Sequence, residues 1–318
     1  MFASVLVSSC SKEEIGADMP YITFRVAEVD AETKSLMTNE TLNSSTTSVT
    51  VYGIKNNKDQ IFNGVKIKKQ SDSYNWQPTT SSPKWVSGSS YSFYGYTYSG
   101  TCQVDKEGLK ITVSQPQTYS ESAMVDYLLS HAYKVADGKN NHIVMLYMQH
   151  AMACAEIVVK QQIPEHLITL NEITLKGIYT SATMECEDQA NANSGENNVW
   201  KTQISGSNET VNYSKTYTAA DKQNSTLGTM TILAVPQQLT QTTKLSVTYS
   251  VDEDNNETTP PTQHTDVFNL FNYIPYVWEA GHKVRYTLNI NTGVELNAEI
   301  VDWIEAGYIE GVILPPKQ

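Results

Sequence analysis

Six histidines are the residues of this 318-residue chain best suited to acid–base or metal chemistry: His131, His142, His150, His166, His264 and His282. No two of them have the i, i+4 spacing of a helical zinc site, and the chain has neither a G-x-S-x-G elbow nor a phosphate-binding loop. His150 lies in a strongly apolar run, and the sequence nominates neither a nucleophile nor a carboxylate to work with it. We therefore predict a buried, hydrogen-bonded His150 in a protein that is not an enzyme and has no metal ion and no cofactor.

Cys10 follows an apolar residue and two small residues in the sequence VSSC, the pattern of a bacterial lipobox. A cysteine processed at such a site carries acyl chains, and each buried CH₂ adds about 0.8 kcal/mol to membrane binding. Residues 1–7 are apolar, as at the end of a secretory signal, although no Lys or Arg precedes them. We therefore expect an exported lipoprotein in which residues 1–20 are signal remnant, lipobox and tether. The alternative is an incidental thiol in a polar tail.

The other three cysteines are Cys102, Cys154 and Cys186. At most one disulfide could form among them, and their spacing resembles no zinc site. Cys154 lies in an apolar run, so we expect a small core side chain there. The acidic stretch at residues 252–257 lacks the glycine and the terminal glutamate of a calcium loop, which favours a solvated turn.

Charge and composition exclude some classes of function. The net charge of −12 disfavours nucleic acid as a partner, because an acidic surface repels phosphates. No run of 18 apolar residues occurs that could cross a bilayer as a helix. Threonine, serine, asparagine and tyrosine are abundant, and β-branched and aromatic side chains favour strands over helices.

Short alternating segments separated by turn residues predict an all-β chain of two tandem β-sandwiches. Asn63-Gly64 is a hairpin-turn signal. Residues 142–159 are the most apolar part; their methionines have helical spacing, but the β-rich context favours one long strand or two strands joined by a bend. We place the N-terminal domain at residues 21–160 and the C-terminal domain, with a C-terminal extension, at residues 161–318.

A cluster of aromatic residues follows Ser90: Tyr91, Phe93, Tyr94, Tyr96 and Tyr98. Exposed aromatic rings could stack on sugars, which would indicate a glycan-binding platform. The alternation of Tyr91 and Phe93 within a strand favours core packing on at least one face. We expect core packing and keep a surface glycan-binding lipoprotein as the alternative function.

Several stretches together resemble the fimbrillin family, the pilin subunits of Bacteroidales type V pili. The resemblance rests on the lipobox at Cys10, the sequence TKS at residues 33–35, and residues 49–53, 85–96, 126–129, 144–159, 231–239, 278–290 and 301–303. It implies two transthyretin-like β-sandwich domains and a structural, non-enzymatic role. It also implies export as a lipoprotein to the outer membrane, and assembly with other pilin subunits into surface fimbriae that support adhesion to a host or bacterial surface, through a glycan or a protein.

The family's precursors are cut by a trypsin-like protease after Arg or Lys, which removes the first strand and opens a groove for a donor strand from another subunit. Lys34, in an exposed polar segment, matches the family's position; Arg25, within the first strand, is the alternative. The candidate donor segment is C-terminal and contains Tyr308, Ile309, Val312, Ile313 and Leu314. A plain terminal strand is the competing interpretation of that segment. A tip adhesin would combine the fimbrial and glycan-binding hypotheses.

Overall fold

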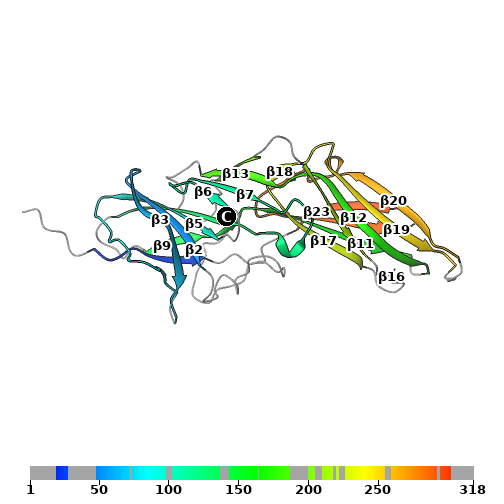
Figure 1. Ribbon diagram of the computed structural model, residues 1–318, viewed down its shortest axis with the longest axis horizontal. Helices are drawn as coiled ribbons and strands as arrows, with labels where there is room; N and C mark the ends of the chain where they lie inside the picture. Colours follow the sequence, from blue (N-terminus) through cyan, green and yellow to red (C-terminus); the bar gives the residue numbers. More distant parts are fainter. Residues whose placement is uncertain are drawn as a thin grey trace, which may run out of the picture.

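The computed structural model describes residues 19–27, 48–71, 74–97, 102–136, 143–163, 165–186, 200–204, 210–217, 220–221, 226–254, 259–291 and 294–301. These residues form strands β1 to β23 and two single 3₁₀ turns, and no α-helix occurs among them. The strands build an elongated body, with β2, β3 and β9 at one end and β16, β19 and β20 at the other (Figure 1). The predicted all-β class of packed sandwich sheets is confirmed.

An eight-stranded sheet forms the N-terminal end, in the order β10-β8-β5-β2-β3-β4-β1-β9. Its strands are β1 (Thr23–Ala27), β2 (Val49–Lys55), β3 (Asp59–Lys69), β4 (Trp76–Pro78), β5 (Ser90–Thr97), β8 (Leu128–Val135), β9 (Ile143–Tyr147) and β10 (Gln149–His150). The two ends of this order, β9 and β10, are neighbours in the chain, and β9 also lies against β8. The sheet therefore curls around one apolar core, which contains Phe24, Phe62, Trp76 and Phe93.

A second sheet has the order β14-β13-β7-β6 and packs on the outside of the first. It consists of β6 (Gln103–Val104), β7 (Lys110–Ser114), β13 (Ser181–Cys186) and β14 (Trp200–Ile204). Between the two sheets β5 is buried on both faces: Tyr91 and Phe93 belong to the N-terminal core, whereas Tyr94 and Tyr96 belong to the larger second core. One face of β5 therefore packs into the core inside the curled sheet, and its other face packs against the second sheet.

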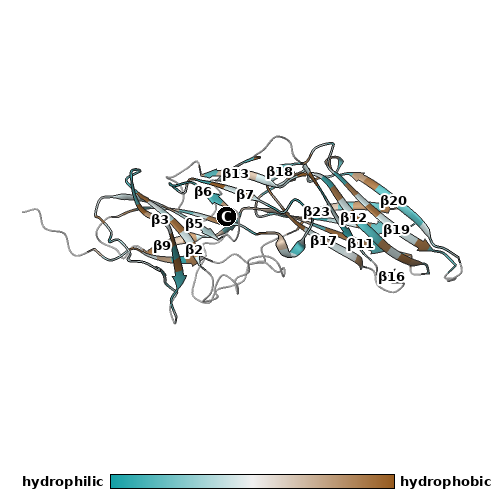
Figure 2. Ribbon diagram, viewed as in Figure 1, coloured by the Kyte–Doolittle hydropathy of each residue, from teal (hydrophilic) through white to brown (hydrophobic). Residues whose placement is uncertain are grey.

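Two further sheets make the C-terminal sandwich. One has the order β17-β11-β22-β23 and the other the order β15-β12-β19-β20, with β16 paired to β12. The strands are β11 (Ala153–Gln161), β12 (Leu167–Tyr179), β15 (Thr210–Thr216), β16 (Ala220–Asp221), β17 (Thr226–Ala234), β19 (Lys244–Asp252), β20 (Thr262–Asn269), β22 (Lys283–Ile290) and β23 (Val294–Val301). A small ladder joins β18 (Gln237–Gln238) to β21 (Val277–Trp278), and the 3₁₀ turns are η1 (Glu121–Ala123) and η2 (Leu270–Asn272). Hydrophobic and hydrophilic positions alternate along the sandwich strands (Figure 2).

The apolar run at residues 142–159 is extended, as predicted, although it contributes to three strands, β9, β10 and β11, with short breaks between them. The hairpin expected at Asn63-Gly64 is wrong. The chain turns instead at Asn56 and Asn57, which both have positive φ, and Gly64 adopts its φ of +63° inside β3. Both sites accept a left-handed backbone, so the dipeptide signal alone does not distinguish a turn from an irregularity within a strand.

Strand pairing crosses residue 160. β11 lies in the C-terminal sandwich between β17 and β22, while β13, further along the chain, pairs with β7 of the N-terminal half. One continuous core also reaches from Tyr94 in β5 to Leu296 in β23. The division at residues 160 and 161 stays a prediction, and the sheet that contains β7 and β13 links the two halves physically.

Gly177 offers a sharp test of this packing. It has φ of +78° at an irregularity of β12, and a Cβ added there would lie 2.4 Å from the carbonyl oxygen of Thr242. A left-handed backbone costs a non-glycine residue about 1–3 kcal/mol, to which this overlap adds. We expect G177A to lower the free energy of unfolding by about 2 kcal/mol or more, measured by chemical denaturation.

Gly88 provides the matched control, because it has φ of +77° and a Cβ there would meet nothing within 4 Å. G88A therefore carries only the backbone cost of about 1 kcal/mol. Equal losses for the two variants would contradict the close approach of the Thr242 carbonyl.

Candidate functional site

The first strand of the N-terminal half, β1, completes the curled sheet. On one side it runs parallel to β9, with register pairs from Thr23 and Ile143 to Ala27 and Tyr147. On its other side it runs antiparallel to β4, where Phe24 is opposite Trp76. Within the described strands β1 is the only ladder partner of β9, so its removal would expose both β4 and β9 as unpaired edges.

The inward side chains of β1 are part of the core. Phe24 of β1 and Ile22, which directly precedes the strand, are fully buried. The ring of Phe24 meets the rings of Phe62 and Phe93 edge-on, each with a centroid distance of 5.6 Å. Such aromatic pairs add about 0.5–1.5 kcal/mol beyond the burial of their area. Loss of β1 would therefore uncover an apolar groove lined by aromatic rings.

Backbone contacts fix the segment that leads into β1. The amide of Ile22 donates to the carbonyl of Pro83 at 2.9 Å, and the Ser82 hydroxyl donates to the Ile22 carbonyl at 2.6 Å. The amide of Trp85 donates to the carbonyl of Pro20 at 3.1 Å. The whole segment from residue 20 to residue 27 thus lies as an added strand on residues 76–85 and 143–147.

Arg25 is the predicted processing residue that the structure describes. It is exposed, faces away from the core, and donates from Nε to Asn75 Oδ1 at 3.3 Å. Its backbone lies in the ladder opposite Met145, so a protease could reach the bond after Arg25 only once β1 has left the sheet. Lys34, Cys10 and the donor candidates Tyr308, Ile309, Val312, Ile313 and Leu314 lie outside the described residues.

His150 is buried, as predicted, and the structure adds the partner that the sequence did not nominate. Its Nδ1 lies 2.8 Å from Oδ2 of Asp126, and the two side chains are 0% and 2% exposed. Asp126 precedes β8, and His150 ends β10, which pairs with β8. The pair is sealed from solvent, so it ties two segments of the sheet together and offers no access to a substrate.

The cysteines of the described segments serve packing. Cys102, Cys154 and Cys186 are all free thiols. Burial raises the pKa of Cys102 and of Cys154 to about 12 in each case. Thiols with such pKa values are protonated at neutral pH and are poor nucleophiles. Cys154 is the core residue that its apolar surroundings predicted.

The aromatic cluster of β5 is core as well. Tyr91, Phe93, Tyr94 and Tyr96 are at most 1% exposed, and Tyr98 lies outside the described residues. Burial raises the pKa of Tyr94 and Tyr96 above the ordinary range of tyrosine. The premise of the glycan platform, exposure of these rings, is therefore wrong, because β5 has protein on both faces rather than on one.

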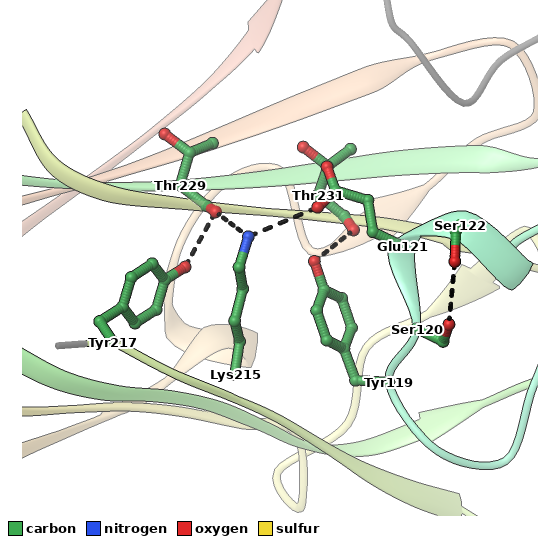
Figure 3. A network of polar contacts seen from close by, with 8 residues as sticks. All are labelled: Tyr119, Ser120, Glu121, Ser122, Lys215, Tyr217, Thr229 and Thr231. Atoms are coloured by element: carbon green, nitrogen blue, oxygen red, sulfur yellow. Dashed lines mark hydrogen bonds and ion pairs between the residues drawn. The ribbon is translucent and has the colours of Figure 1, made fainter.

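A polar cluster joins η1 to the C-terminal sandwich (Figure 3). The ammonium of Lys215 lies between the rings of Tyr119 and Tyr217, at 5.9 and 5.4 Å from their centroids. It donates to the carbonyl of Thr229 at 2.8 Å and pairs with Glu121 at 3.4 Å. Cation–π contacts, a hydrogen bond and an ion pair hold this lysine in place. We interpret Tyr119, Glu121, Lys215, Tyr217 and Thr229 as a structural contact, called the clasp below, that joins β15 and β17 to the segment before β8.

Across the described parts of the chain, no group of three or more His, Cys, Asp or Glu side chains could hold a metal ion. In the same parts, no helix is long and apolar enough to cross a membrane.

Comparison with known proteins gives a family and a fold. A model of the family described as fimbrillin-like matches residues 33–303. The crystal structure of a candidate cell adhesion protein from Bacteroides uniformis aligns with a TM-score of 0.52 and 16% identity, over 89% of this chain and 98% of that one. A second, from Bacteroides ovatus, has a TM-score of 0.52, 13% identity, and coverage of 92% and 100%. At these identities the likeness shows the fold alone. No curated protein matches the chain.

Phe24 tests how much the N-terminal core depends on β1. Replacing a fully buried phenylalanine by alanine costs about 3–5 kcal/mol. We expect F24A to lose stability in that range in the intact chain, measured by denaturant unfolding.

The control is Thr23→Ala at the neighbouring, partly exposed position, for which we expect a loss below about 1 kcal/mol. A similar small loss for F24A would mean that β1 does not contribute to the core as its burial indicates.

Proposed function

Because the chain belongs to the fimbrillin-like family, we propose that it is a structural fimbrial subunit of the cell surface that assembles by exchange of β1 for a strand of another subunit. The role is non-enzymatic and supports adhesion. One observation carries the proposal: β1 is a short N-terminal strand that closes a sheet and covers an aromatic core.

The physical argument concerns what removal of β1 leaves behind. Trp76 on β4 and Val144 on β9 flank Phe24 in the ladder, and all three side chains are buried. Without β1 these two strands have unsatisfied backbone groups next to an apolar groove. An extended peptide with alternating apolar side chains would restore both the hydrogen bonds and the burial. Because such a contact between subunits is head-to-tail and does not close, it produces a filament.

Proteolytic cutting of the chain would trigger the exchange of β1. A cut after Lys34 would release a segment that contains all of β1, and that segment would carry Cys10 with any lipid on it. Cutting at Lys34 is favoured over cutting at Arg25, because the backbone of Arg25 is held in the ladder. Before the cut, lipid on Cys10 would hold the precursor at the outer membrane.

The donor is proposed to be the C-terminal segment of a neighbouring subunit, in which residues 308–314 read YIEGVIL. Ile309 and Ile313 would lie on one face of an extended strand, and Tyr308 and Val312 on the other. The partners are other pilin subunits and a trypsin-like processing protease.

Limited digestion of the purified chain with trypsin tests this function. We expect cutting near Lys34 to release the N-terminal segment and to produce a ladder of multimers that resists dissociation, seen by electrophoresis without boiling. Lys34→Gln should stay monomeric under the same digestion, whereas Arg25→Gln should still assemble.

A synthetic peptide with the sequence of residues 308–314 should cap the groove and shorten the ladder, and a peptide of scrambled sequence should not. Clean removal of residues 1–34 that leaves a persistent monomer would overturn the proposal.

A further inference from the structure

The two ends of the body differ in charge although the chain is acidic overall. Within residues 48–97 the described positions contain six lysines and one aspartate, whereas the described positions within residues 151–179 and 210–301, which form the C-terminal sandwich, contain eleven acidic and six basic residues. In the body, β3 lies at one end, and β16, β19 and β20 lie at the other (Figure 1). The charge is therefore separated along the direction in which a head-to-tail filament would grow.

The positive charge gathers on the outer face of β3 and β1. Lys66 and Lys68 alternate with the buried Ile67, so both point away from the core, and both are exposed. Gln77 of β4 is opposite Lys68, and Arg25 extends the same face on β1. We call the face formed by Lys66 and Lys68 the basic face; Arg25 lies beside it only as long as β1 is in place. Among the described carboxylates none forms an ion pair with these three residues.

The negative charge gathers where the C-terminal sandwich ends. Asp252 is opposite Leu167 at the end of the β12–β19 ladder, and the exposed Glu253 follows it. β11 ends at Gln161, a few residues before β12 begins at Leu167, and the last residues of β11 pair with the end of β22. The end of β22 therefore lies at the same end of the sandwich as Asp252. In the next ladder Asn289 of β22 is opposite Glu295 of β23, which is also exposed. We call Asp252, Glu253 and Glu295 the acidic end; Lys160, which pairs with Asn289, is a described cation close to it.

We propose that the basic face of one copy of this chain docks on the acidic end of a second copy. The occupant is another copy because the same molecule carries the complementary charge at its opposite end. The contact is heterologous, so it propagates from copy to copy without closing. This inference rests on the proposed fimbrial function and adds the surfaces that bring subunits together before strands exchange. Lys66 and Lys68 lie beyond either processing residue, so they stay on the subunit after the cut.

Charges that face each other across an encounter raise association rates by 10- to 1,000-fold, and salt removes the effect. The experiment follows multimer formation by light scattering after the cut, at about 10 mM and about 1 M salt, where charges are screened over about 30 Å and 3 Å. At low salt we expect K66E/K68E to slow the initial rate about tenfold or more. At high salt its rate should match that of the parent chain.

Two matched variants make the result specific. K58E/K106E changes the net charge equally at two exposed lysines away from the basic face, and it should change the rate less than twofold. D252K/E253K should be slow alone, but should recover the rate when mixed with K66E/K68E. Equal rates for K66E/K68E and the control, or no recovery in the mixture, would overturn the inference.

Anionic vesicles are the competing occupant. If K66E/K68E lost binding to phosphatidylglycerol vesicles but associated at the parental rate, the basic face would serve a membrane and the proposed contact would be wrong. Failure of the fimbrial proposal looks different, because then no variant forms multimers at any salt. In that case sedimentation of the uncut chain tests the proposed contact by itself. The contact is supported if the chain self-associates at about 10 mM salt and K66E/K68E abolishes that association. It is contradicted if the chain stays monomeric at every salt concentration.

Discussion

The N-terminal half depends on the burial of one short strand. Ile22 and Phe24 are fully enclosed, and the backbone around them is the only ladder that β9 has among the described strands. In the sequence β1 precedes all the other described strands, so a cut between β1 and β2 would separate it from them in the chain. If the proposed exchange takes place, the same strand that closes the sheet would, on leaving, expose a binding groove.

The C-terminal half does not include β1, and several separate contacts hold the two halves together. The β7–β13 ladder, the buried contact between Asp126 and His150 and the clasp around Lys215 all lie at or near the junction. The large core continues from Tyr94 into the C-terminal sandwich. The proposed exchange of β1 would therefore leave these contacts in place, and the subunit would keep its shape.

Local patterns in the sequence predicted the strands but not their partners. Alternation identified most strands, because that signal lies within a few residues. For residues 142–159 the β-rich context favoured an extended conformation over the helical spacing of the methionines. The pairing of β13 with β7 joins segments about 70 residues apart, and Asp126 reaches His150 through the fold, so no local pattern contains either contact. The aromatic residues of β5 alternate as on a half-buried strand, yet both faces are covered, since a third layer packs there. The turn expected at Asn63-Gly64 failed because Asn56 and Asn57 accept the same backbone.

Amide hydrogen exchange of the cut and uncut chain, with and without the peptide of residues 308–314, tests the central claim most directly. If β1 is the removable strand, trimming should abolish protection in residues 143–147, whose only ladder among the described strands is with β1. The peptide should restore that protection, and protection in β11 and β12 should not change. Unchanged protection of β9 after complete release of β1 would contradict the account, because β9 would then have a ladder that does not depend on the first strand.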